Sequence, residues 1–261
     1  MFAPRLSPAG FPMAPTQEEW EALTADERAE VVAALPGEVT EAEMAPPEGD
    51  RHFKAKTRAL GALRSFFTKQ RRRVYLAAEL PVYYPNAPRF APDLLAVLDA
   101  EDCERDKWLV SAEGKGIDWV LEVHVGGDRK KDAQRNVIRY AQLGIPEYFL
   151  YDRARSRLHA YRLDAPNARA YSAIVPQHGL YESRVLGLDV QVAKDRLRFY
   201  FGTALLLESD ELIARLESML DEAQQRAEEE AARRQEEAAR RQEAEREVAR
   251  LREELEALKR K

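Results

Sequence analysis

The sequence predicts a mixed α/β fold followed by a long C-terminal helix. Residues 119–125 read Trp-Val-Leu-Glu-Val-His-Val, and this strict alternation predicts a strand with one apolar face. A helix-length segment, 128–143, separates this strand from an apolar run at 147–151, so the three predict a strand-helix-strand unit with parallel strands. Residues 213–258 instead place apolar side chains three and four positions apart, which is typical of a coiled coil.

Composition bounds the kind of protein. The 261 residues allow one large domain, or one domain with an appendage, and a hydrophobic share of 45% is enough for a core. Residues 208–261 hold 17 of the 46 acidic and 12 of the 41 basic side chains, so this segment carries the net charge of −5. The single cysteine, Cys103, excludes an intrachain disulfide and a cysteine-based metal cluster. With no membrane-spanning run and no secretory signal, we expect a soluble, cytoplasmic protein.

The N-terminal part begins with a proline-rich stretch. We expect residues 1–15, which hold four prolines, to form a flexible leader. Thr16 and Glu19 have the spacing of a capping box, so a helix is expected to start at about residue 17. A second helix is expected at 25–35, where Pro-Gly then ends it.

A longer amphipathic helix is expected at 52–69, with the basic run 69–73 at its end. These cations either are solvated at a helix C-terminus, which they favour, or form a rim that contacts phosphate. Strands are expected at 74–84 and 90–98. Further strands, which we expect to pair antiparallel, are predicted at 158–163, 171–175, 185–192 and 197–200.

Two carboxylates mark the predicted strands. Asp93 follows a proline at a strand entrance, and Glu122 lies inside an otherwise apolar strand, where burying an unpaired carboxylate is costly. His124 shares the face of Glu122 because strand side chains alternate. Carboxylates at the ends of adjacent strands can hold Mg²⁺, which prefers oxygen ligands and activates water for attack on a phosphodiester. The pattern therefore indicates a metal-nuclease core.

These residues resemble the Uma-type restriction endonuclease family, a branch of the PD-(D/E)XK nuclease superfamily. The resemblance covers roughly residues 38–200 and rests on Met44–Pro47, His52, Pro92-Asp93, Glu122-Val123, Asp132, Tyr140 and the run Gly144-Ile-Pro-Glu-Tyr-Phe-Leu-Tyr-Asp152. It implies a restriction-endonuclease-like core with flanking helices and DNA cleavage that depends on Mg²⁺, with Mn²⁺ as a substitute. Asp93 and Glu122 would then ligate the metal, together with the carbonyl of Val123.

The chain departs from the family pattern where a water-activating group is expected. The family's helix lysine falls on Asn136, and its small or apolar residue two past the glutamate is His124. His124 can act as a base near neutral pH but lacks the fixed charge of a lysine. Lys130 or Lys131 would be the substitute from the first turn of the same helix. The alternative is a catalytically degenerate nuclease-fold protein that acts as an oligomeric interaction or DNA-binding module.

Two further alternatives stay open in the sequence. Glu113 and Lys115 form a competing second motif with Asp93, although the glycines beside them predict a turn. His52 and Glu43 are either auxiliary groups at the mouth of the site or part of a solvated loop.

The chain thus divides into a flexible leader at 1–15, a restriction-endonuclease-like domain at 16–206 and a C-terminal helix at 207–261. The tail's a and d positions are apolar at both ends but hold Arg and Glu in the middle. We expect residues 212–258 to form a coiled coil that makes the protein a homo-oligomer. A single helix held by Glu-Arg pairs four residues apart is the other interpretation. DNA is the expected partner, and a membrane is not.

Overall fold

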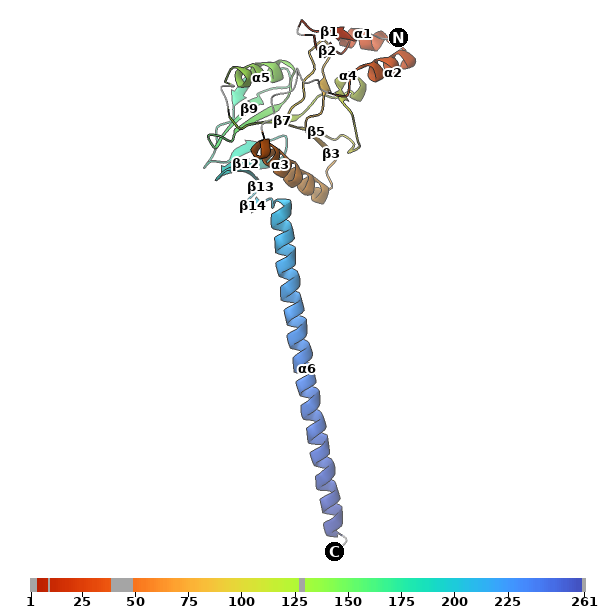
Figure 1. Ribbon diagram of the computed structural model, residues 1–261, viewed down its shortest axis with the longest axis vertical. Coiled ribbons are helices and arrows are strands. Elements are labelled where there is room, and N and C mark those ends of the chain that lie inside the picture. The colour runs from red at the N-terminus through yellow and green to blue at the C-terminus, as the bar shows by residue number, and fades with distance from the viewer. Residues whose placement is uncertain (1–3, 9, 39–48, 127–129, 260–261) are drawn as a thin grey trace. The chain divides into compact units, whose positions relative to one another are not determined.

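The computed structural model describes residues 4–8, 10–38, 49–126 and 130–259. The chain divides into two compact units, Met1–Glu208 and Ser209–Lys261 (Figure 1). The first unit is a mixed α/β fold, as predicted. Its described helices are α1 (Gln17–Ala22), α2 (Ala25–Ala34), α3 (Gly49–Gln70), α4 (Val110–Glu113) and α5 (Lys130–Gln142). Its described strands are β1 (Arg5–Leu6), β2 (Pro12–Met13), β3 (Val74–Ala77), β4 (Val82–Tyr83), β5 (Leu94–Leu98), β6 (Trp108–Leu109), β7 (Trp119–His124), β8 (Glu147–Asp152), β9 (Arg157–Leu163), β10 (Tyr171–Ala173), β11 (Tyr181–Ser183), β12 (Leu188–Ala193), β13 (Arg196–Phe201) and β14 (Ala204–Leu205).

A six-stranded sheet in the order β10-β9-β8-β7-β5-β3 forms the centre of this unit. Strands β7 and β8 are parallel, with Trp119 opposite Glu147 and His124 opposite Asp152. The other pairs of this sheet are antiparallel. The predicted strand-helix-strand unit is therefore confirmed, and so is the antiparallel pairing of the later strands, some of which form a second sheet of order β11-β12-β13-β14.

Both faces of the central sheet are covered. Trp119, Leu121 and Val123 pack on one face with residues of α3, β12 and β13. Val120 packs on the other face with Tyr140 of α5. The alternation along β7 is thus confirmed. It places Glu122 on the α5 face, and this topology also sets β5 directly beside β7.

The N-terminal helices begin as the sequence predicts. The Thr16 side chain accepts the backbone N–H of Glu19 at 3.2 Å, and the Glu19 carboxylate accepts that of Thr16 at 2.8 Å. The stretch predicted as a flexible leader instead contains the antiparallel pair β1-β2 in its described part. Ala14 is 1% exposed and belongs to an apolar cluster with Trp20 and Leu35. This burial anchors the end of the proline-rich stretch to the domain.

The strand expected at 74–84 is broken into β3 and β4. Glu79 lies between them in a left-handed backbone conformation with φ of 54°, and its N–H donates to the carbonyl of Pro92 at 3.0 Å. The strand expected at 90–98 pairs in the sheet only from Leu94 onward. Pro92 has no N–H to donate to a sheet, which is consistent with this later start.

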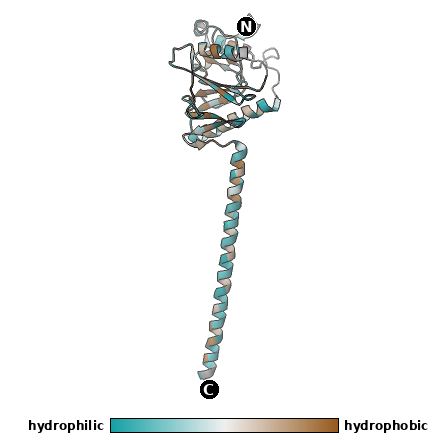
Figure 2. Cartoon of the chain, turned by 90° about the vertical axis from the view of Figure 1, so that its left-hand side faces the viewer, coloured by the Kyte–Doolittle hydropathy of each residue, from teal (hydrophilic) through white to brown (hydrophobic). Residues whose placement is uncertain are grey.

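The second unit contains α6 (Ser209–Lys259). Figure 2 shows it as mostly hydrophilic with apolar residues at intervals. Ion pairs four residues apart join Glu222 to Arg226, Glu230 to Arg234, Glu236 to Arg240, Glu237 to Arg241, and Arg250 to Glu254. Among the described residues, no helix combines the length and hydropathy that a membrane span requires.

Candidate metal centre

Asp93 connects three elements at the entrance of β5. Its Oδ2 accepts a hydrogen bond from the backbone N–H of Val123 at 2.7 Å, which ties the carboxylate to β7. Its Oδ1 lies 2.9 Å from Nε2 of His52 on α3. The side chain is only 15% exposed, so its charge is mostly removed from water but still reachable from it.

Glu122 lies beside Asp93 because β5 and β7 are neighbours and Leu94 is opposite Leu121. Its Oε1 accepts a hydrogen bond from the hydroxyl of Tyr140 at 2.6 Å. Tyr140 belongs to α5 and is itself 2% exposed. The two carboxylates predicted from the sequence, and the Val123 backbone between them, are thus brought together.

The electrostatics of this carboxylate pair favour a bound cation. Burial raises the pKa of Glu122 well above its ordinary value of 4.5, and the negative charge of Asp93 raises it further. The hydrogen bond from Tyr140 offsets only part of this effect. A divalent cation with a preference for oxygen would neutralise both carboxylates, so the donor set fits Mg²⁺ or Mn²⁺.

A second group of ligand atoms adjoins Asp93. His52, Glu79 and Asp93 each offer one ligand atom, and the three atoms lie within 4.8 Å of one another. The ammonium group of Lys56, whose side chain is 7% exposed, forms an ion pair with Glu79. Sequence reasoning named His52 but missed Glu79 and Lys56. The available signal was the spacing of Lys56, four residues after His52 and therefore on the same face of α3.

The other predicted site residues are less completely defined. His124 is the last residue of β7 and pairs in register with Asp152 of β8, on the face that it shares with Glu122. Lys131 lies in the first turn of α5, but its side chain is outside the described residues, as is that of Lys130. Glu43 also falls outside them.

The competing motif, Glu113 and Lys115, lies away from Asp93. Glu113 forms an ion pair with Arg105 at 2.8 Å. The Nζ atom of Lys115 donates to the carbonyl of Leu98 at 2.6 Å, at the opposite end of β5 from Asp93. About 16 Å of strand separates Asp93 from Leu98 at roughly 3.3 Å per residue. The structure therefore pairs Asp93 with Glu122.

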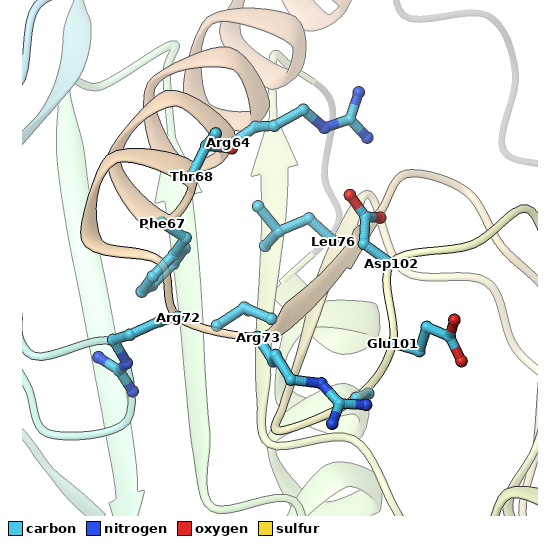
Figure 3. A pocket seen from close by; sticks show the side chains of 10 residues that line it. Arg64, Phe67, Thr68, Arg72, Arg73, Leu76, Glu101 and Asp102 are labelled. Carbon is cyan, nitrogen blue, oxygen red and sulfur yellow. The ribbon is translucent and has the colours of Figure 1, made fainter.

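The basic run 69–73 also lies at the far end of β5, because Val74 is opposite Leu98. Arg72 stacks on Phe67 and donates to the carbonyl of Leu186 at 3.2 Å. A hollow of about 280 Å³ lies beside it, with Arg72 and the carboxylates of Glu101 and Asp102 on opposite sides (Figure 3). The basic run therefore lies at the end of β5 away from Asp93 and does not border the carboxylate pair.

The hydrogen bond from the Tyr140 hydroxyl to Glu122 is expected to stabilise the fold. Tyr140→Phe removes the hydrogen-bond donor from the partly buried Glu122 carboxylate, so we expect the free energy of unfolding to fall by roughly 1–3 kcal/mol. Urea denaturation of the metal-free protein at neutral pH measures this change. Tyr148→Phe is the matched control, because the buried Tyr148 hydroxyl has no hydrogen-bond partner among the described residues. Equal losses in the two variants would contradict a specific role for the Tyr140 hydroxyl.

Comparisons with known proteins identify the family to which the chain belongs. The family model described as "Uma2: Putative restriction endonuclease" matches residues 16–193. Among solved structures, the chain is similar to a putative nuclease belonging to DUF820 from Anabaena variabilis, at 14% identity and a TM-score of 0.42, over 55% of this chain and 76% of that one. No curated protein matches. The family match spans most of the first unit, and the chain belongs to the Uma2 restriction endonuclease family.

Proposed function

We propose that this chain is a DNA endonuclease that hydrolyses phosphodiester bonds and depends on a divalent metal. The observation that carries the proposal is the partly buried pair of carboxylates, Asp93 and Glu122, on neighbouring strands. Family membership supports a nuclease function, and a restriction endonuclease family suggests DNA as the substrate.

The proposed roles follow from the contacts. Asp93 and Glu122 would hold Mg²⁺ or Mn²⁺, with the carbonyl of Val123 as a further ligand. When bound, the ion polarises the phosphodiester and lowers the pKa of the attacking water. His52 fixes Asp93 through Oδ1, and Tyr140 orients Glu122 through its hydroxyl.

Lys56 is our candidate for the positive charge that the family's helix lysine would supply. The resemblance places Asn136 at that lysine's position, whereas Lys56 is buried and forms an ion pair with Glu79, whose carboxylate lies within 4.8 Å of that of Asp93. A fixed cation at this place would stabilise the negative charge that develops on the phosphate during hydrolysis. His124 and Lys131 remain the two alternatives for orienting the water.

The asparagine at position 136 favours a second candidate function, that of a binding protein without fast catalysis. A chain that lacks the family lysine would bind metal or DNA without fast cleavage. Residues 212–258 would then assemble copies of a nuclease-fold interaction module. Retained cleavage that is lost in Asp93→Asn excludes this second candidate.

Nicking of supercoiled plasmid in Mg²⁺ or Mn²⁺ tests the proposal. We expect the wild type to nick DNA, Glu122→Gln to be inactive, and both to be silent in EDTA. Glu113→Gln serves as a matched control that keeps its activity, because Glu113 contacts Arg105 and not Asp93. A wild-type protein that cleaves no DNA with either metal would refute the proposed function.

A further inference from the structure

The apolar stripe of α6 is exposed along the described helix. The side chains of its large apolar residues are 47–57% exposed at Ile213, Leu216, Leu220, Val248, Leu251 and Leu255. An isolated helix gains little stability without burial, so this stripe fits a helical partner. In chain order, its a and d positions are Ile213, Leu216, Leu220, Ala223, Ala227, Glu230, Arg234, Glu237, Arg241, Ala244, Val248, Leu251, Leu255 and Leu258.

The middle of this stripe alternates in charge. Glu230, Arg234, Glu237 and Arg241 follow one another at the a and d positions. Within the helix, Arg234 binds Glu230 at 2.5 Å and Arg241 binds Glu237 at 2.7 Å. Any partner of the whole stripe must therefore meet a negative, positive, negative, positive series.

A second copy that pairs in parallel and in register would place like charges opposite one another. Each charged residue would face its own counterpart, so four successive layers would hold two carboxylates or two guanidinium groups. Like charges at the centre of a coiled coil oppose pairing. Pairs at the flanking positions, such as Glu247 with Arg252, would attract, but solvated pairs contribute little.

We propose that α6 pairs with the α6 helix of a second copy in antiparallel orientation, with Ile213 opposite Leu258. At the centre, Glu230 then faces Arg241 of the second copy, and Arg234 faces Glu237. Moving inward from the ends, the remaining layers pair Leu216 with Leu255, Leu220 with Leu251, Ala223 with Val248, and Ala227 with Ala244.

This alignment satisfies both parts of the stripe at once. Every apolar layer contains only apolar residues, and every charged layer contains one Glu and one Arg. Together with the pairs within each helix, the contacts close rings of four alternating charges. Charges removed from water are tolerated when they are paired and hydrogen-bonded in this way.

Antiparallel pairing has a consequence for the nuclease unit. About 68 Å of helix separates residues 213 and 258 at roughly 1.5 Å per residue. The two N-terminal units would therefore be attached at opposite ends of the coil. The pairing itself does not depend on the proposed nuclease activity.

Cysteine cross-linking of the full-length chain tests the orientation. With the exposed Cys103 changed to Ser, Ala227→Cys and Ala244→Cys are prepared as separate single variants. In a glutathione redox buffer, the antiparallel coil predicts disulfide-linked dimers when the two variants are mixed, and almost none from either variant alone. Dimers from each variant alone would show parallel pairing and overturn the proposal.

Light scattering of charge-reversal variants tests the central layers. We expect the wild type to be a dimer. In Arg234→Glu/Arg241→Glu the dissociation constant of the dimer should rise at least about 10-fold, because carboxylates would then face one another. The control Arg215→Glu/Arg246→Glu makes the same change in net charge on the outer face and should remain dimeric. A monomeric wild type, or equal weakening in both variants, would overturn the proposal.

Discussion

Glu122→Gln is expected to stabilise the metal-free protein while it abolishes DNA cleavage. The neutral amide avoids both the burial of a charge and the repulsion from Asp93, which together raise the pKa of Glu122. We expect the free energy of unfolding at neutral pH to rise by roughly 1–3 kcal/mol, the scale of an uncompensated buried group. Cleavage should fall by about 10³-fold or more because a metal ligand is lost.

The sign of the pH dependence follows from the direction of this shift. The folded state holds the Glu122 proton to higher pH than the unfolded state does, so stability falls as pH rises above the ordinary value of 4.5. This loss should continue up to the raised pKa and should be absent in Glu122→Gln. Urea denaturation in EDTA across this range measures it. If the free energies of unfolding of the two proteins changed with pH in parallel, the pKa of Glu122 would not be raised in the folded state.

The second large effect is expected at Lys56. If its charge replaces the family lysine, Lys56→Gln should lower kcat by about 10²–10³-fold and leave metal affinity unchanged. Lys56→Arg should keep part of the activity because the positive charge remains. Glu79 is mostly exposed, so losing its partner should cost little stability.

Rescue makes the Lys56 assignment specific. Asn136→Lys places a lysine on α5 where the resemblance predicts the family's helix lysine, and we expect it to recover part of the activity when it is added to Lys56→Gln. Lys54→Gln is the matched control, since Lys54 lies on the same helix but pairs with Asp50 in solvent. Full activity in Lys56→Gln would show that Lys56 has no part in catalysis and would leave His124 and Lys131 as the candidates.

The two carboxylates could be predicted individually because a local sequence pattern marks each of them. Alternation in β7 sets the face of Glu122, and a proline marks the entrance to β5 before Asp93. That the two strands would be neighbours followed from the resemblance to a known family. The choice between Glu122 and Glu113 needed the structure, because only the observed register shows that Lys115 contacts the far end of β5.

Lys56 and Glu79 could not be predicted because their meeting depends on tertiary placement. Glu79 approaches Asp93 through a left-handed turn whose N–H binds Pro92, and an alternating pattern gives no sign of such a turn. Lys56 approaches Glu79 only because α3 packs across the sheet. The burial of Ala14 in an apolar cluster could not be predicted either, because the short strands in this proline-rich stretch show no hydrophobic periodicity.

Calorimetric titration of Mn²⁺ into the wild type, Asp93→Asn and Glu122→Gln tests the central claim most directly. The partly buried carboxylate pair predicts saturable binding to the wild type and a loss of at least about 100-fold in affinity in both variants. Glu113→Gln should bind as the wild type does. Equal Mn²⁺ affinity in all four proteins would contradict a metal centre at Asp93 and Glu122.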